Sequence, residues 1–349
     1  MANEKNVLQT PEIVFYNVKN KPFKIYGLYN AESETKFCRM PGEIAGVVSE
    51  GVKHLAFETA GGRVRFSTDS QYISIRTKMP YVSDFKHMPK TGTTAFDLYV
   101  DTDGGSRYVK TFINQNTVFD GGYEGSCKFE DRKMRKITIN FPSYNAVDSL
   151  HIGIEKGAEL GEGAKYVFDL PVVFYGSSIT QGACSSRPGM IYENIISRKY
   201  NLDYLNLGFS GSAKGEAAIA DYISVLDMIA FVADYDHNAP NAEHLGRTSL
   251  EMYEKIRKNH PDIPYILVSR PDFATHNRYD GIARRDALTE VYREARERGD
   301  KNIYFIDGEG IFRGPLFDCC TVDGTHPNDF GMVKLAESIG KVLESALRR

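Results

Sequence analysis

The hydrophobic pattern of this 349-residue chain changes near its middle, and that change limits the folds the chain can adopt. Before about residue 165, apolar and polar residues alternate, as in RVRFSTDS (residues 63–70) and KITINF (residues 136–141). A period of two is typical of strands that bury one face. No stretch in this half has a helical period, and glycine-rich turns such as VDTDGG separate the strands. We therefore predict an all-β, jelly-roll-like sandwich over residues 1–165.

Residues 166–349 instead combine short, nearly continuous apolar runs with helical patterns. PVVFYG (residues 171–176) and YLNLG (residues 204–208) are typical of strands buried on both faces. Between such runs, segments like MIYENIISRKY (residues 190–200) space their apolar residues three and four apart. This alternation predicts an α/β domain, with a parallel sheet covered by helices on both faces. The glycine- and charge-rich segment 155–166 is the predicted boundary between the two domains.

Composition argues against several classes of function. The formal net charge is -3 and no basic block is present, so nucleic-acid binding is not expected. No apolar stretch approaches the roughly 18 residues of a membrane span. The five cysteines include no C-x-x-C pair, which predicts free thiols in a reducing compartment. The first residues lack the apolar core of a signal peptide, so we expect a cytoplasmic protein unless a signal segment has been removed.

Polar loops follow the predicted strands of the second half, at the edge where parallel sheets bind ligands. GSSITQG (residues 176–182) follows the first strand and GFSGSAKGE (residues 208–216) the second. DGTHPND, ahead of the last helix, holds Asp323 and His326 three positions apart, within reach of a hydrogen bond. A carboxylate so placed orients an imidazole that can deprotonate a serine hydroxyl. Each motif alone is more often a helix cap or a polar turn, and their joint order favours catalysis.

Together these segments resemble the SGNH (GDSL-type) serine hydrolases, esterases with a flavodoxin-like three-layer α/β/α fold. YGSSITQG (residues 175–182) looks like the first block of that family, NLGFSGS (residues 206–212) the second, and DGTHPNDFG (residues 323–331) the last. The Ser-Arg-Pro-Gly stretch after the first block is similar to one branch. In that branch the hydrolase domain follows a sandwich with a G-x-D-L-Y motif, which AFDLYVD (residues 95–101) resembles, with alanine in place of the glycine.

The resemblance implies a role for five residues. Ser178 takes the place of the nucleophile, with His326 as the base and Asp323 as the triad acid. The amides of Ser178 and Gly211 and the side chain of Asn238 take the place of the oxyanion hole. The third block departs from the family pattern, because it contains ADYDHNAP instead of Gly-x-Asn-Asp. The alternatives to Asn238 are therefore the neighbouring Asp236 and Asn241.

Two nearby residues are candidates for substrate binding, and each has an alternative structural role. Arg187 could bind a carboxylate or hydroxyl of the substrate, or it could form a structural ion pair. His237 could line the pocket, or it could be an ordinary packing or surface histidine. Cys184 follows Ser178 with no base arranged for it, so we expect a small buried side chain.

The resemblance implies a serine esterase that forms an acyl-enzyme and needs no metal and no cofactor. A sandwich joined to an esterase domain is similar to carbohydrate esterases, so the expected substrate is an O-acetyl ester on a small molecule or an oligosaccharide. A thioesterase or lysophospholipase-type acyl hydrolase is an alternative, although no long apolar lid segment is evident. A non-catalytic carbohydrate-binding protein is a second alternative. The sequence leaves open whether the chain forms a homo-oligomer.

Overall fold

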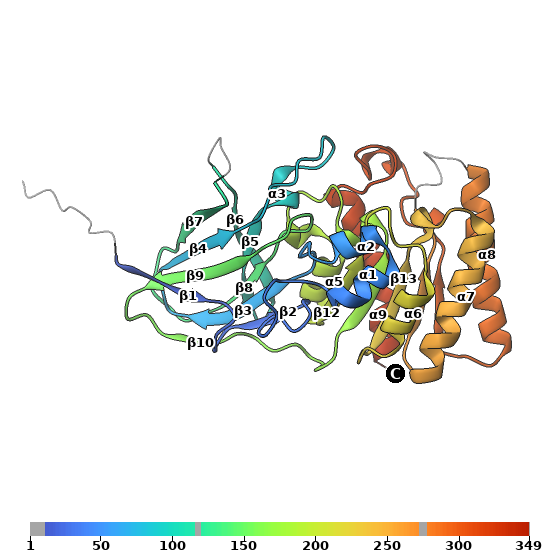
Figure 1. Cartoon of the computed structure of the whole chain (residues 1–349), viewed down its shortest axis with the longest axis horizontal. Coiled ribbons are helices and arrows are strands. Elements are labelled where there is room, and N and C mark those ends of the chain that lie inside the picture. The colour runs from blue at the N-terminus through green and yellow to red at the C-terminus, as the bar shows by residue number, and fades with distance from the viewer. Residues whose placement is uncertain (1–10, 116–119, 272–277, 349) are drawn as a thin grey trace, which may run out of the picture.

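The structure is a computed structural model that describes residues 11–115, 120–271 and 278–348. The antiparallel strands lie at one end of an elongated molecule, and the α/β elements lie at the other (Figure 1). None of the helices in these described ranges is long and apolar enough to cross a membrane.

The first half contains two antiparallel sheets packed face to face. One sheet has the order β1-β9-β4-β7, and the other has the order β10-β3-β8-β5-β6 with β2 paired to β3. The predicted alternation is confirmed, because Phe66 and Ile137 of one sheet and Ile75 and Ile152 of the other are fully buried in one shared core. The strands are β1 (Ile13–Asn17), β2 (Lys24–Tyr26), β3 (Arg63–Thr68), β4 (Tyr72–Lys78), β5 (Phe96–Thr102), β6 (Gly105–Phe112), β7 (Gly122–Lys128), β8 (Arg135–Asn140), β9 (Ser149–Glu155) and β10 (Leu160–Glu162).

The expectation that the first half lacks helices is wrong. The chain forms α1 (Gly42–Val48), α2 (Glu50–Leu55) and the single turn α3 (Lys90–Thr93). Helices this short show no clear period and are stabilised by tertiary packing. Ala45 and Val52 are buried in the core of the α/β part and not in the sandwich core. Residues 42–55 thus precede the predicted boundary but pack on the second half. The domain boundary at residue 165 stays a prediction.

The second half is built on a five-stranded parallel sheet with the order β12-β11-β13-β14-β15. This is the 2-1-3-4-5 order of flavodoxin-like folds, in which the ligand site lies where the strand order reverses, between β11 and β13. The predicted parallel sheet is therefore confirmed. The strands are β11 (Val172–Gly176), β12 (Tyr204–Gly208), β13 (Ala230–Asp234), β14 (Tyr265–Val268) and β15 (Ile303–Ile306).

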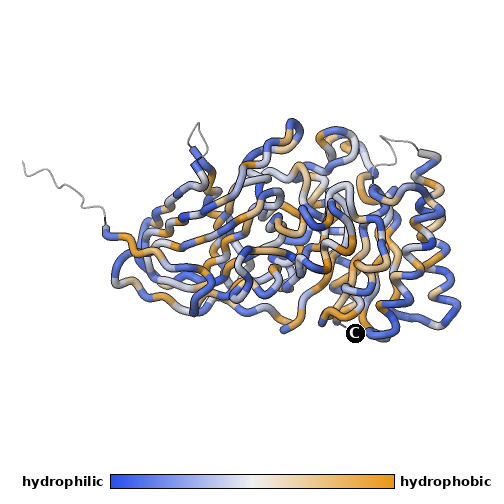
Figure 2. The backbone as a smooth tube through the Cα atoms, viewed as in Figure 1, coloured by the Kyte–Doolittle hydropathy of each residue, from blue (hydrophilic) through white to orange (hydrophobic). Residues whose placement is uncertain are grey.

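Helices cover both faces of this sheet, so the predicted three-layer arrangement is confirmed. On one face, α1, α2, α6, α7 and α8 enclose a core with Val173 and Leu267, and on the other α5 and α9 pack on Phe174 and Ile266. Hydrophobic and hydrophilic stretches alternate along the outer helices α7 and α8 (Figure 2), as expected of helices that bury one face. The helices are α4 (Ser178–Gln181), α5 (Tyr192–Tyr200), α6 (Ala217–Ser224), α7 (Ala242–Asn259), α8 (Arg278–Glu297) and α9 (Asp329–Leu347), with short 3₁₀ turns η1 (Pro188–Met190), η2 (Asp236–Asn238), η3 (Gly308–Gly310) and η4 (Phe317–Cys319).

Candidate active site

Ser178 is the first residue of the one-turn helix α4 and follows a tight turn after β11, the strand between β12 and β13 in the sheet. A side chain at Gly176 would overlap the Thr180 side chain and the Asp234 carbonyl, so the turn requires glycine there. The Ser177 amide donates to the Asp234 carbonyl of β13 at 3.0 Å, and the Ser177 hydroxyl caps α4 by accepting from the Ile179 amide at 3.2 Å. These bonds hold Ser178, which is 7% exposed, at the carboxyl end of the sheet.

The structure joins Ser178, His326 and Asp323 in one hydrogen-bonded chain. Ser178 Oγ lies 2.9 Å from His326 Nε2, and His326 Nδ1 lies 2.7 Å from Asp323 Oδ2. Asp323 Oδ1 also accepts from the backbone amides of His326, at 2.8 Å, and Thr325, at 3.0 Å. Partial burial raises the pKa of Asp323, but these hydrogen bonds outweigh it and lower that pKa to about 2. Asp323 is therefore ionised at neutral pH and can stabilise a protonated His326.

The predicted oxyanion donors lie at the same edge of the sheet. Gly211 follows β12 with φ +68°, a conformation that favours glycine. No described residue accepts a hydrogen bond from the backbone amide of Ser178 or of Gly211, so both donors are available. Asn238 ends the turn η2 just after β13, and its amide oxygen is buried without a hydrogen bond to the described residues. The roles of all three residues stay predictions.

Comparison with known families identifies the fold. A sequence profile described as the GDSL-like lipase/acylhydrolase family matches residues 169–344, just over half of the chain. The chain belongs to this family. A second profile, described as the GxDLY N-terminus of SGNH hydrolase-type esterases, matches residues 13–160. No curated protein matches the sequence of this GDSL-type hydrolase.

Solved structures resemble this GDSL-type hydrolase over more than nine tenths of its length. A GDSL-like lipase from Bacteroides ovatus is 26% identical, with a TM-score of 0.85 over 95% of this chain and 98% of that one. A salicylyl-acyltransferase from a tetracycline biosynthetic pathway is 19% identical, with a TM-score of 0.76 over 95% and 97%. A family two carbohydrate esterase from Clostridium thermocellum, solved with cellohexaose, is 14% identical, with a TM-score of 0.63 over 93% and 99%. The last two likenesses establish the fold alone.

The GxDLY-like motif of this hydrolase connects the sandwich to the α/β part. Asp97 of β5 is fully buried and accepts from Asn140 Nδ2 and from the Gly189 amide, both at 2.7 Å. A side chain at Gly189 would overlap Tyr99, so the two segments are in close contact. On the far side of the same stretch, Ser186 donates two hydrogen bonds to Asp329, at the start of α9. The Ser-Arg-Pro-Gly stretch is thus held between the sandwich and the helix that follows His326.

The two candidate substrate-binding residues lie in different settings. Arg187 Nε is 3.6 Å from Asp97 Oδ2, and its guanidinium group lies 4.2 Å from the centre of the Tyr108 ring. These contacts form the structural ion pair that the sequence offered as an alternative. His237 is half-buried in η2, beside Asn238. A role in substrate binding stays a prediction for both residues.

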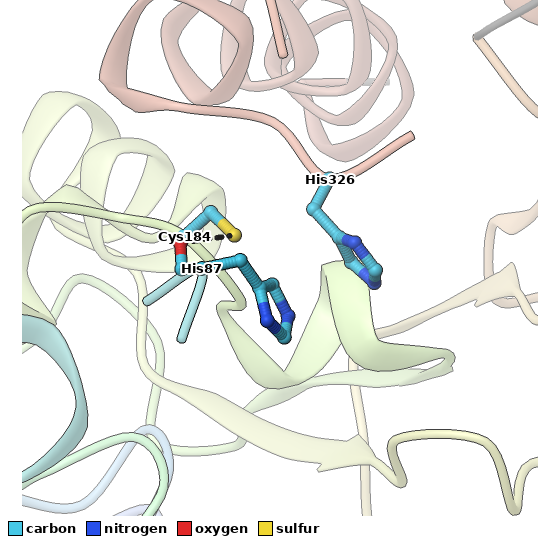
Figure 3. Close-up of side chains that lie close together, drawn as sticks. All are labelled: His87, Cys184 and His326. Carbon is cyan, nitrogen blue, oxygen red and sulfur yellow. Dashed lines mark hydrogen bonds between the residues drawn. The ribbon is translucent and has the colours of Figure 1, made fainter. Parts of the chain in front are cut away.

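Loops of the sandwich also reach the candidate site, although no sequence motif predicted their contribution. The Tyr144 hydroxyl donates to the Ser178 carbonyl at 3.0 Å. His87, in the loop 79–89 between β4 and α3, has its ring centre 5.4 Å from that of His326. The Cys184 thiol donates to the His87 carbonyl at 3.4 Å (Figure 3). Burial and the nearby Asp323 carboxylate raise the pKa of Cys184 to about 12, which argues against a nucleophilic thiol.

A buried polar network supports the loop that contains Gly211. The Ser210 amide donates to Gln181 Oε1 at 2.9 Å, and Gln181 Nε2 donates to the Glu58 carboxyl group. Burial raises the pKa of Glu58 to about 7, although Arg39 and Gln181 lower it. Arg39, which is fully buried, donates from Nε to the Glu58 carbonyl at 2.7 Å. Residues of the segment before β3 therefore help to position the loop that contains Gly211, through Gln181.

Proposed function

We propose that this chain is a serine esterase in which Ser178 attacks the carbonyl carbon of an ester. The observation that carries the proposal is the hydrogen-bonded chain from Ser178 Oγ through His326 to Asp323, with links of 2.9 and 2.7 Å. His326 Nε2 removes the Ser178 proton as the new C–O bond forms. Asp323 holds the Nδ1 proton and stabilises the imidazolium that results.

The attack places a negative charge on the former carbonyl oxygen. The amides of Ser178 and Gly211 and the side chain of Asn238 would donate hydrogen bonds to it. The ester C–O bond then breaks, the alcohol leaves with the proton from His326, and the acyl group stays on Ser178. Water attacks this acyl-enzyme with His326 again as the base, which releases the carboxylic acid and restores Ser178.

The proposed substrate is a carbohydrate that carries O-acetyl groups. The family two carbohydrate esterase with the same two-part fold was solved with cellohexaose, and an acetyl xylan esterase from Butyrivibrio proteoclasticus also shares the fold. Ser178 is only 7% exposed, so a substrate must bring its ester carbonyl to a nearly buried hydroxyl group. Acyl transfer to an alcohol is a second candidate, favoured by the higher TM-score of the salicylyl-acyltransferase.

The catalytic proposal is tested with p-nitrophenyl acetate. Ser178→Ala should lower kcat by at least about 10⁴-fold, as should Asp323→Asn, while both variants stay folded. Asn238→Ala should lower kcat by about 100-fold or more. Asn241→Ala is the matched control, because the Asn241 side chain caps α7 by accepting from the His244 amide at 2.8 Å. It should cost about 1 kcal/mol of stability and leave the rate unchanged.

A folded Ser178→Ala variant with undiminished turnover would refute Ser178 as the nucleophile. A folded wild-type chain without any turnover would refute the esterase proposal and favour a carbohydrate-binding protein. A rate lost in Asn241→Ala and kept in Asn238→Ala would move the oxyanion role to Asn241.

A substrate panel tests the acyl group and the acceptor. Acetylated oligosaccharides should lose acetyl groups, measured by mass, faster than long-chain esters or thioesters are hydrolysed. Preferred cleavage of long-chain substrates would favour the acyl hydrolase alternative. Accumulation of a new ester when a sugar alcohol is added would favour acyl transfer.

A further inference from the structure

Three side chains with metal-binding atoms meet at the candidate triad, and one of them is the triad residue His326. His87 comes from the sandwich loop 79–89, Cys184 from the turn after α4, and His326 from the segment before α9 (Figure 3). One ligand atom of each residue lies within 4.8 Å of the others. His87 is exposed, His326 is half-buried and Cys184 is buried, so the cluster opens to solvent on the His87 side.

The chemistry of this cluster suits a borderline-soft cation. Two imidazole nitrogens and one thiolate form a donor set that binds Zn²⁺, with metal–nitrogen and metal–sulfur distances of about 2.0–2.3 Å. Around a tetrahedral ion such ligand atoms lie roughly 3.3–3.8 Å apart, so the three groups need to approach one another by about 1 Å. Rotation of the exposed His87 side chain would move its nitrogen toward the other two groups, and small rotations of Cys184 and His326 would have to close the remaining distance between them. The fourth position would be left for water.

The backbone on both sides of the cluster is held in place. Asn145 is fully buried and bonds the loop 79–89 twice, from Nδ2 to the Tyr81 carbonyl and from the Ser83 amide to Oδ1, both at 2.8 Å. Cys184 has φ +66°, a left-handed conformation that is unfavourable for residues other than glycine. Strain of this kind is concentrated at functional positions. Here it places the thiol against the His87 backbone.

Binding of a metal ion would disable the triad for a geometric reason. His326 Nε2 is bonded to Ser178 Oγ, and Nδ1 is bonded to Asp323 Oδ2. A cation needs a free lone pair on one of these two nitrogens. Coordination therefore breaks either the bond that activates Ser178 or the bond that orients the ring.

We propose that His87, Cys184 and His326 form an inhibitory Zn²⁺ site, shared between the sandwich and the α/β part. On binding, the thiol proton is released to solvent and the sulfur coordinates as a thiolate. The inhibitory effect rests on the proposed esterase function, whereas binding of the metal does not. The site would make the esterase responsive to the concentration of free zinc.

Binding is tested first, with Co²⁺ as a spectroscopic probe for the full chain. A thiolate ligand gives Co²⁺ a charge-transfer band in the near ultraviolet. One Zn²⁺ ion per chain should displace the bound Co²⁺ and remove this band. Cys184→Ala should abolish the band, and His87→Ala, at an exposed position, should weaken Co²⁺ binding in a chain that stays folded. Cys319→Ala, which removes an exposed thiol elsewhere, is the matched control and should keep the band.

Inhibition is tested next, with p-nitrophenyl acetate and added Zn²⁺, and each rate is expressed relative to the same variant without metal. Removing a group that only supports a metal ligand weakens metal binding by about 10–100-fold. His87 is a proposed ligand itself, so His87→Ala should raise the half-inhibiting Zn²⁺ concentration by at least about 10-fold.

An active wild-type chain with no Co²⁺ band, or a band that survives Cys184→Ala, would overturn the metal site. If the band appears in the wild type and is lost in Cys184→Ala, but the wild type has no esterase activity, the metal site would be supported and the proposed function refuted. Ser178→Ala should retain the band, because Ser178 is not a ligand.

Discussion

Replacing Asp97 by alanine would measure how much the GxDLY-like contact stabilises the fold. Its carboxyl group is fully buried and accepts from Asn140 Nδ2 and the Gly189 amide, both at 2.7 Å. Removing it leaves two buried donors without an acceptor, at about 1–3 kcal/mol each. Under acidic conditions, where the folded protein keeps this carboxyl group protonated, the free energy of unfolding should fall by about 2–6 kcal/mol.

The same substitution should have a smaller effect at higher pH. Burial raises the pKa of Asp97 to about 6, although Asn140, Gly189 and two arginines lower it. An unfolded aspartate has a pKa of about 3.9, so the folded state holds its proton more tightly. This contribution to stability is fully present below the pKa that Asp97 has in the unfolded state. It is lost as the pH rises through the pKa that Asp97 has in the folded state. Between about pH 4.5 and pH 7.5 the wild type loses about 2 kcal/mol in this way.

Because alanine cannot titrate, the destabilisation caused by Asp97→Ala should shrink by about 2 kcal/mol over that pH range. Urea unfolding of both proteins at the two pH values measures it. Asp103→Ala, in the exposed turn between β5 and β6, is the matched control and should change stability by less than about 0.5 kcal/mol. An Asp97→Ala effect that is equal at both pH values, or larger at the higher one, would refute the reasoning.

Three further substitutions test the packing around the candidate site. In Gly51→Ala the new methyl group would overlap the Ser212 hydroxyl beside the oxyanion loop, so kcat/KM should fall roughly 10–100-fold, and Ser212→Ala in the same chain should restore part of it. Gly189→Ala would place a methyl group 2.6 Å from Tyr99 Cε2, and an unchanged urea midpoint would contradict the expected loss of about 1–3 kcal/mol. Arg39→Met removes the donor to four backbone carbonyls, and calorimetry should show a destabilisation of about 3 kcal/mol or more, not a neutral change.

The regular strands and long helices could be predicted because their patterns are local. In β3, β8 and β9 every second residue faces one core, and in α9 the apolar residues recur on one side, so burial leaves a direct trace in the sequence. The helices α1 and α2 left no such trace. With seven and six residues they are too short for a period, and the α/β core on which they pack is distant in sequence.

In the candidate site, too, the local contacts could be predicted from the sequence and some of the distant ones could not. Asp323 and His326 lie in one turn, so their contact follows from a spacing of three residues. The hydrogen bond between Ser178 and His326 spans 148 positions, and it was expected from the order of the strands and a family resemblance. No pattern indicated that Tyr144 would bond to the Ser178 backbone or that His87 would lie beside His326.

The sequence by itself determined the two kinds of sheet, the loops at the strand ends and the motifs of a GDSL-type hydrolase. These depend on the periodicity of side chains and on backbone geometry within a few residues. Only the tertiary structure decided that the sandwich takes part in the site, through Tyr144, His87 and the buried contact of Asp97 with Gly189. Such contacts depend on how two independently patterned halves pack together, and no local spacing along the chain encodes that packing.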